Sequence, residues 1–423
     1  MAKTPRFLEP VYPEEALSKV LSALNLKPEA EKVKLEKAYG RILAEDLCSP
    51  EDIPPYNMAF FDGYAVRVED LKGASEDKPV RLRVAGKIEL QTRKPPKIRP
   101  GEAYKTATGA PIPEGANLLI PFEWTREENG EIVVNREIEP WKFVIVKGKD
   151  FTKGSTILKA GRRLRVQDLS LLFRLRIKAV KVYGKPKVGL ISVGSELTTN
   201  LNVKDPLKVP ASHGILFEKL VEALGGEPKY LGVVPDSLEA ITAKLREAVK
   251  KFDIVATLGG SSVGEKDLVA KAVNRLGKPG MVVNGLKVRP GAATRLGIAR
   301  GKPIVLIPGL IQSAIVGFHF LLLPLILAKL GLTLEDYRPT VKAKIGQSLT
   351  FIDRFGYRRI HFVKLNRRTD GFEAEPLVGE SPLMRIPVNA SGYIIPPRGK
   401  EKAEPGELVD VYMVPGLFQL GEE

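Results

Sequence analysis

The chain has 423 residues, of which 43% are apolar and 27% charged, as in an ordinary soluble protein of about two to four domains. Its single cysteine, Cys48, excludes a disulfide framework or a cysteine-rich metal site within one chain, and the formal charge of +16 favours an acidic partner such as a phosphorylated small molecule or an oxyanion. Dispersed lysines and arginines argue against nucleic acid as a partner, and the N-terminus lacks the apolar core of a signal peptide, so we expect a cytoplasmic protein.

The N-terminal region predicts a helix followed by extended chain. Residues 12–24 have apolar side chains at helical spacing and Pro13 in the first turn, which is typical of a surface helix. Residues 44–53 are expected to be extended, and the two prolines that follow indicate a domain edge. A second helix, at residues 166–173, is assigned to the same domain as the first.

Between these helices, short strands separated by turns predict an inserted β-rich domain. Within it, residues 106–116 form a loop stiffened by two prolines around an isoleucine. Such a pre-ordered loop suits a binding site or, equally, a structural corner. The expected strands are residues 80–84, 103–107, 117–121 and 132–136.

From residue 187, buried strands alternate with amphipathic helices, which predicts an α/β domain with a mainly parallel sheet. Ser212 is expected to open one helix. Asp236, with Glu239 three residues later, has the spacing of a capping box and is expected to cap the next helix. The expected strands are residues 188–193, 231–234, 252–258, 282–288 and 304–308.

The segment 252–267 contains the strongest local signal for a ligand. A buried strand runs into a glycine-rich loop, whose backbone can turn sharply and approach a ligand closely. A helix is expected from residue 268, so an oxyanion would be favoured at its N-terminus, where Asp267 adds a carboxylate. The alternative is a tight turn that binds nothing. The loop residues are Gly259, Gly260, Ser261, Ser262 and Gly264.

Three loops are expected at one edge of the parallel sheet. Right-handed crossovers would bring together residues 194–196, 259–264 and 308–313, which follow three different strands. Because three loops converging at strand ends are stronger evidence than one, this arrangement favours a ligand site.

Residues 310–330 form a long apolar stretch that must be weighed as a membrane span or a core helix. Gln312, His319 and Pro324 interrupt it, so we expect a helix buried in a core or a subunit interface and no membrane segment. Beyond residue 332, strands and turns predict a small C-terminal β domain.

Short motifs along the chain can be compared with those of known families. They are FDGYAVR (61–67), TGAPIPEGA (108–116), SVGSEL (192–197), GVVPDS (232–237), GGSSVGEKD (259–267), RPGA (289–292), IPG (307–309) and SGYIIPP (391–397). In this order they resemble the MoeA family, the molybdopterin molybdenumtransferases, which are related to the E domain of gephyrin. The resemblance spans nearly the whole chain.

The resemblance implies an elongated, multidomain fold of the α/β plus β class. It also implies a homodimer, in which the β domain of one subunit approaches the α/β domain of the other. The implied domains are a linker domain (1–52 and 140–184), an inserted β domain (53–139), a molybdopterin-binding α/β domain (185–331) and a C-terminal β domain (332–423).

The implied reaction takes adenylylated molybdopterin and molybdate. It breaks the pyrophosphate link, releases AMP and leaves the metal on the dithiolene, with Mg²⁺ assisting. Other proteins of molybdenum-cofactor biosynthesis are implied as partners. The 33 prolines and the many charged residues are typical of a thermophile, in which tungstate could replace molybdate.

The resemblance also implies roles for individual residues. Asp62, Glu196 and Asp267 would be catalytic, and Asp267 would bind Mg²⁺, which prefers oxygen ligands. Arg289 would neutralise an anion through its charge and forked donors. The other implied substrate-binding residues are Thr108, Ser212, Gly259, Gly260, Ser261, Ser262, Gly264, Pro308, Gly309 and Ser313.

Several positions depart from the family pattern. A lysine expected at Ala292 is absent, Leu310 and Ile311 replace an asparagine and a proline, and His213 replaces an asparagine. Two hypotheses therefore stand. One is a metal-inserting transferase with an altered pocket; the other is a non-catalytic paralogue that binds a pterin or nucleotide, or acts as a dimeric scaffold. In the first, either Arg289 or its neighbour Lys287 could replace the missing lysine.

Overall fold

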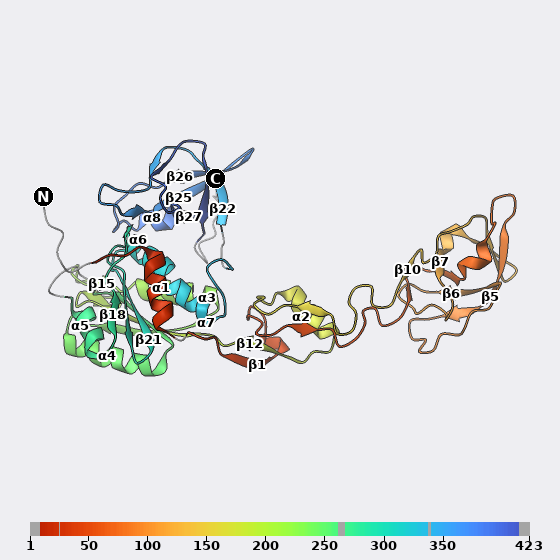
Figure 1. Cartoon of the computed structure of the whole chain (residues 1–423), viewed down its shortest axis with the longest axis horizontal. Coiled ribbons are helices and arrows are strands. Elements are labelled where there is room, and N and C mark those ends of the chain that lie inside the picture. Colours follow the sequence, from red (N-terminus) through yellow and green to blue (C-terminus); the bar gives the residue numbers. More distant parts are fainter. Residues whose placement is uncertain (1–8, 25, 261–266, 337–339, 414–423) are drawn as a thin grey trace. The chain divides into compact units, whose positions relative to one another are not determined.

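The computed structural model describes residues 9–24, 26–260, 267–336 and 340–413. The chain divides into two compact units. The large unit comprises Met1–Val33, Gly40–Ala44 and Lys181–Glu423, and the small unit comprises Lys34–Tyr39 and Glu45–Val180. The small unit is drawn mainly in orange and yellow in Figure 1. The four-domain division implied by the family resemblance remains a prediction.

A six-stranded sheet forms the centre of the large unit. The first four strands in its spatial order are parallel, whereas β20 is antiparallel to β21 and β18 is antiparallel to β20. The predicted mainly parallel sheet is therefore confirmed. The order is β16 (Glu227–Val234), β13 (Lys187–Val193), β17 (Ile254–Gly259), β21 (Lys302–Ile307), β20 (Arg295–Ala299) and β18 (Gly280–Val283).

Helices cover both faces of this sheet (Figure 1). Along β17, Ile254 and Ala256 belong to one core and Val255 to the other, because successive strand side chains point to opposite faces. The first core contains α3 (His213–Leu224), α6 (Ile311–Gly317) and α7 (Leu323–Lys329), and the second contains α4 (Leu238–Lys251) and α5 (Leu268–Arg275).

The N-terminal helix α1 (Pro13–Ala23) packs on the large unit. Ala16 and Val20 are fully buried in the first core, and the helix contacts β18 and the π-helical segment Phe318–Leu322. The predicted apolar face is confirmed. The residues that α1 contacts belong to the large unit. The sequence had instead placed this helix in the linker domain.

The apolar stretch is a continuous helix made of α6, the π-helical segment and α7. The span Ile311–Lys329 has a mean hydropathy of 2.0, so its length and composition would suit a membrane span. However, 89% of that stretch is buried inside the large unit. The prediction of a helix buried in a core is therefore confirmed.

His319 lies in the π-helical segment and is buried, with its Nδ1 atom 2.6 Å from the Tyr393 hydroxyl. Burial lowers the pKa of His319 from 6.5 to about 3, because the surroundings disfavour the charged ring. Below pH 6.5 the unfolded chain therefore binds a proton that the folded chain does not bind until about pH 3. Stability is lost as the pH falls through this window.

We expect this histidine to contribute about 1.4 kcal/mol of lost stability per pH unit within that window. The measurement is urea unfolding between pH 7.5 and 4, followed by far-UV circular dichroism, for the wild type and His319→Gln. The stability difference between the two proteins should shift in favour of the variant as the pH falls. Parallel stability curves would contradict the expectation.

The C-terminal part of the large unit contains a closed β-barrel, drawn in blue in Figure 1. This confirms the predicted C-terminal β domain. A short helix, α8 (Arg385–Asn389), contacts α6, and β24 (Arg358–Arg359) pairs with β19 (Val288–Arg289). The barrel strands are β22 (Thr340–Ile345), β26 (Gly371–Pro376), β25 (His361–Arg368), β27 (Gly392–Ile394) and β29 (Leu408–Tyr412).

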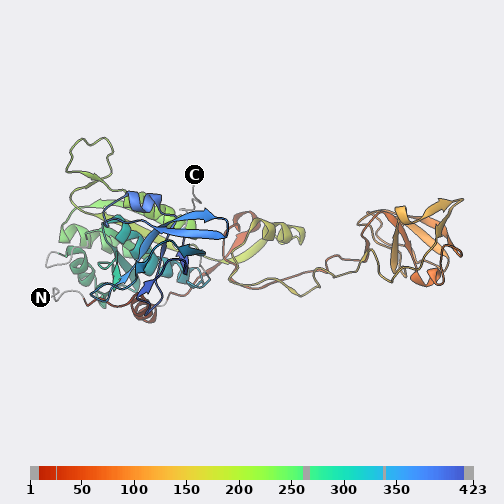
Figure 2. The same cartoon turned by 90° about the horizontal axis from the view of Figure 1, so that it is seen from above.

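The small unit contains a second six-stranded sheet, drawn in orange in Figure 2. The predicted inserted β-rich region is thus confirmed. The unit also contains α2 (Val166–Arg174), which begins where the sequence predicted a helix. Two short antiparallel pairs are β11 (Thr156–Leu158) with β2 (Leu47–Cys48) and β10 (Val144–Ile145) with β3 (Met58–Ala59). The sheet order is β7 (Leu118–Pro121), β4 (Gly63–Val66), β6 (Glu102–Thr106), β5 (Val80–Ile88), β9 (Glu131–Val134) and β8 (Arg126–Glu128).

Candidate functional site

The predicted loops of the large unit meet at the carboxyl edge of its parallel strands. β13, β17 and β21 end level with one another, since Val193 pairs with Gly259 and Leu258 pairs with Ile307. A cavity of about 310 Å³ lies at this edge, and we call it the strand-edge cavity. Its size is within the range of small-molecule sites.

All three loops contribute to the strand-edge cavity. The lining also includes Pro382 and Met384, which precede α8. No local pattern marks these two residues, because only the packing of α8 on α6 brings them here. The predicted site residues that line the cavity are Glu196, Ser212, Gly259 and Gly309.

Glu196 is an exposed carboxylate held on a tight loop after β13. A Cβ on Gly194 would lie 2.6 Å from the Glu196 carboxylate, so a larger residue at 194 would displace the acid from this position. Asp236 anchors the same loop: the Ser195 N–H donates to Asp236 Oδ2 at 2.9 Å, and the Asp236 N–H donates to Ser195 Oγ at 3.0 Å. The loop is therefore ordered without a ligand contact.

The predicted capping box at Asp236 is wrong. The residue that caps α4 is Ser237, whose hydroxyl oxygen accepts a hydrogen bond from the Ala240 N–H at 3.3 Å. Asp236 is instead used to hold the neighbouring loop. Both residues favour helix starts, so spacing alone could not assign the cap.

His213 begins α3 and lines the strand-edge cavity beside Ser212. Its ring is stacked on Phe217 at 6.3 Å, and burial lowers its pKa, which favours the neutral ring. Its Nε2 atom is buried without a hydrogen-bond partner in the described part of the chain. The ring at this wall is thus favoured in its neutral form, with its Nε2 atom unpaired among the described residues.

The two glycines after β17 adopt left-handed conformations, with φ values of +89° at Gly259 and +68° at Gly260. A Cβ on Gly259 would lie 2.8 Å from the Val193 carbonyl oxygen, so a side chain is excluded there. Gly259 lines the strand-edge cavity and Gly260 does not. The predicted residues Ser261, Ser262 and Gly264 lie outside the described residues.

Asp267 caps α5 and forms a buried ion pair. Its Oδ1 accepts a hydrogen bond from the Ala270 N–H at 3.1 Å, and its Oδ2 is paired with Nη1 of Arg295. Asp267 and Arg295 are only 7% and 6% exposed, and neither lines the strand-edge cavity. No pattern in the sequence indicated Arg295.

The surroundings of Asp267 do not fit the predicted Mg²⁺ site. Oδ1 is used by the cap of α5, and Oδ2 lies in the ion pair with Arg295 but accepts no hydrogen bond from the described residues. The guanidinium of Arg295 places a positive charge where a cation would need oxygen ligands. Among the described residues, no group of three or more His, Cys, Asp or Glu side chains could hold a metal ion.

The remaining predicted residues of the large unit lie away from the cavity lining. Arg289 is paired with Asp353, with 3.1 Å between Nη1 and Oδ2, and its guanidinium lies 4.6 Å from the ring centre of Tyr357. Its charge is therefore already partnered. Pro308 and Ser313 flank residues that line the cavity without lining it themselves.

In the small unit, the structure brings Asp62 and Thr108 together. The Thr108 N–H and hydroxyl both donate to Asp62 Oδ1, at 2.7 and 2.9 Å. The backbone bond, then the hydroxyl bond, lowers the pKa of this exposed carboxyl group. Asp62 is thus an oriented carboxylate that stays charged at neutral pH.

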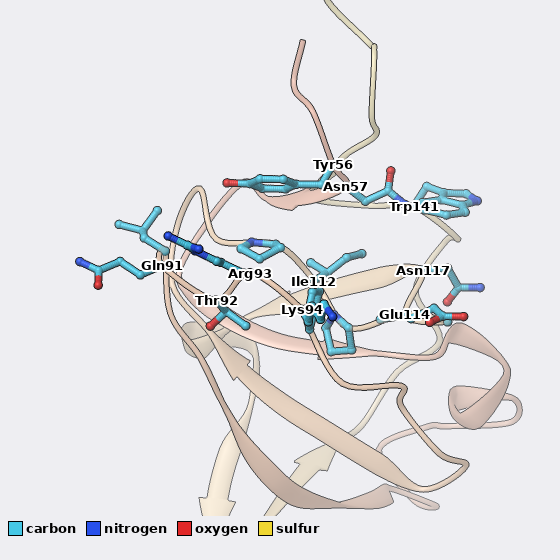
Figure 3. A pocket seen from close by; sticks show the side chains of 16 residues that line it. Tyr56, Asn57, Gln91, Thr92, Arg93, Lys94, Ile112, Glu114, Asn117 and Trp141 are labelled. Carbon is cyan, nitrogen blue, oxygen red and sulfur yellow. The ribbon is translucent and has the colours of Figure 1, made fainter. Parts of the chain in front are cut away.

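A large open cleft lies beside the loop that contains Thr108. Its volume is about 1340 Å³, and Figure 3 shows the rings of Tyr56 and Trp141 on one side, with Arg93 and Lys94 on the loop across from Tyr56. The proline-rich segment predicted to form a stiff loop contributes part of the lining. Aromatic faces and cations together suit a planar, negatively charged ligand.

Two family models match the chain. One, described as the MoeA N-terminal region (domain I and II), matches residues 11–175, and the other, described as a probable molybdopterin binding domain, matches residues 189–328. A molybdopterin molybdenumtransferase of Bacillus subtilis is 30% identical over 414 residues, which are 96% of this chain and 94% of the relative. This chain belongs to the MoeA family.

Other members of the MoeA family agree in sequence and in structure. A molybdopterin molybdenumtransferase of Staphylococcus aureus is 30% identical over 346 residues, 82% of each chain. The crystal structure of a molybdopterin biosynthesis MoeA protein from Pyrococcus horikoshii superposes with a TM-score of 0.83 at 35% identity, covering 96% of this chain and all of that one. The α/β plus β fold implied by the sequence is the fold of this family.

Three of the positions at which this MoeA-family chain departs from the usual motifs, His213, Leu310 and Ile311, line the strand-edge cavity without filling it, whereas Ala292 does not line it. Leu310 and Ile311 both line the cavity, and Leu310 is 47% exposed. The cavity thus persists with a more apolar wall. His213, at the start of α3, also lines this cavity.

Proposed function

We propose that this chain is a molybdopterin molybdenumtransferase that acts in molybdenum-cofactor biosynthesis. The observation on which the proposal depends is the convergence of three loops on the strand-edge cavity, in a chain that belongs to the MoeA family. The proposed substrates are adenylylated molybdopterin and molybdate. In the proposed reaction the pyrophosphate link breaks, AMP leaves, and the metal remains on the dithiolene sulfurs.

The proposed chemistry depends on positioning and on neutralising negative charge, as phosphoryl-group reactions generally do. Glu196 and Asp62 are the carboxylates we propose to orient reacting groups, with Thr108 holding Asp62 in place. Gly259 and Gly309 would let the substrate approach the backbone closely. Ser212 and His213 would supply polar contacts at the helix start. Asp267 is not proposed as a Mg²⁺ ligand, because its carboxylate forms an ion pair with Arg295.

We further propose that the protein acts in the cytoplasm as a homodimer. The single, free Cys48 suits a reducing compartment, and the family resemblance supports the dimer. Tungstate is proposed as an alternative to molybdate, because the two oxyanions share shape and charge. A thermophilic origin is supported by the 33 prolines and the 27% of charged residues.

The test is AMP release by the purified full-length chain, incubated with adenylylated molybdopterin and either molybdate or tungstate. Oxyanion-dependent AMP release is the expected result. Tight binding of the pterin nucleotide without AMP release would instead identify a non-catalytic paralogue.

Asp62→Asn is expected to lower this turnover roughly 100-fold or more, because the carboxylate loses its charge while its size is kept. Asp52→Asn is the matched control: Asp52 is also an acid of the small unit that accepts a backbone N–H, from Lys153 at 2.7 Å. The control should keep nearly full turnover. If both variants release AMP at the same rate, Asp62 has no catalytic role in the proposed reaction.

A further inference from the structure

Arg295 lies at the functional edge of the sheet of the large unit. It is the first residue of β20 and pairs with Leu306, which is one residue before the end of β21. Because β21 ends level with β17, this register puts Arg295 at the edge to which the substrate loops converge. Arg295 does not line the strand-edge cavity itself, but its charge lies beside Asp267 at the same edge of the sheet.

The guanidinium of Arg295 has unused donors. Nη1 is paired with Asp267, while Nε and Nη2 are buried without hydrogen-bond partners in the described part of the chain. The residue is 6% exposed, and burial lowers its pKa to about 10, so it remains charged at neutral pH. Buried donors without partners are costly, and a bound acceptor would remove that cost.

The two residues that the sequence offered as replacements for the missing lysine are already engaged. Arg289 is paired with Asp353 and stacks on Tyr357. Lys287 has its ammonium 5.1 Å from the ring centre of Tyr12. Arg295 differs from both, because it combines a position at the strand edge with two donors that no described residue uses.

We propose that the Arg295 guanidinium takes the place of a divalent cation at Asp267, and that its free N–H groups bind an oxyanion of the substrate, such as a phosphate oxygen. This inference rests on the proposed function for the identity of the substrate. Asp267 then positions Arg295 and caps α5 and has no metal to bind. A fixed guanidinium offers forked donors to a phosphate without a metal's need for further oxygen ligands.

The first test measures metal binding without substrate. Mn²⁺ serves as the probe for Mg²⁺, and electron paramagnetic resonance of the free ion reports binding to full-length protein. The wild type and Asp267→Asn should bind Mn²⁺ within about twofold of each other, because Asp267 does not serve as a ligand. Wild-type binding more than tenfold tighter than that of Asp267→Asn would overturn the proposal.

Arg295→Gln gives the complementary result, since glutamine keeps a hydrogen-bond donor for Asp267 but removes the charge. This variant should gain a Mn²⁺ site that disappears again in the double variant with Asp267→Asn. If the folded Arg295→Gln protein gains no Mn²⁺ site, the Arg295 guanidinium does not occupy the place of a cation.

The second test measures anion binding by calorimetry, with pyrophosphate as the probe and metal absent. Arg295→Gln should weaken binding at least tenfold, whereas Arg275→Gln, an exposed arginine near the end of α5, should change it less than twofold. Unchanged binding in Arg295→Gln would overturn the anion role. Neither test uses turnover, so a chain that binds as expected but releases no AMP would refute only the proposed function.

Discussion

Replacing Arg295 with methionine is expected to lower the free energy of unfolding of the large unit by about 3 to 5 kcal/mol at neutral pH. The change leaves the Asp267 carboxylate buried at 7% exposure without its positive partner. A buried charge without a partner destabilises the fold far more than the apolar contacts of methionine stabilise it. The measurement is urea unfolding followed by far-UV circular dichroism, because most helices belong to the large unit.

The control for this experiment is the double variant Arg295→Met with Asp267→Asn. Asparagine keeps the cap of α5 but carries no charge, so the double variant should regain at least half of the lost stability. If the free energy of unfolding of Arg295→Met lies within about 1 kcal/mol of the wild-type value, Asp267 and Arg295 do not form a buried pair in which each charge depends on the other.

Gly63→Ala is expected to destabilise the small unit by about 3 kcal/mol. Gly63 begins β4 between β7 and β6, and a Cβ there would lie 2.2 Å from the Ile120 carbonyl oxygen. That neighbour is backbone in a paired strand, so it cannot move aside without breaking the ladder. The substitution should also reduce turnover, because Asp62 is the adjacent residue.

Tryptophan fluorescence can follow this loss selectively, since Trp124 and Trp141, the two tryptophans of the chain, both belong to the small unit. Gly86→Ala is the matched control in the same sheet. Its Cβ would lie 3.3 Å from the Tyr104 ring, a side chain that can shift. We expect less than about 1 kcal/mol of destabilisation from the control. Similar losses in both variants would show that the clash with the Ile120 carbonyl oxygen does not determine the cost.

The alternation of apolar runs and amphipathic helices was enough to predict the α/β sheet and the helix over Ile311–Lys329. These signals are local: a strand between two layers needs apolar side chains on both faces, and a helix buried by other helices needs them all round. The level ends of the parallel strands followed from the handedness of the crossovers. For that reason the convergence of the loops could be predicted before any residue was placed.

Local spacing was insufficient where two polar residues compete for one role. Asp236 and Ser237 are both good helix caps, and the choice between them depended on the Ser195 loop, which is 41 residues away from Asp236 in sequence. The position of α1 likewise depended on which surface its apolar face would cover. The spacing of apolar residues shows that a helix has an apolar face. The surface on which that face packs determines where the helix lies.

By itself, the sequence determined the family, the types of element and the glycines that keep strand ends open, because each depends on neighbouring residues or on motifs read in order. The tertiary structure alone decided the partners of the charges. It paired Asp267 with Arg295 and Arg289 with Asp353, pairs that are far apart along the chain. The physical reason is that a buried charge is stable only beside its counter-charge, and which residues meet is decided by strand register and helix packing.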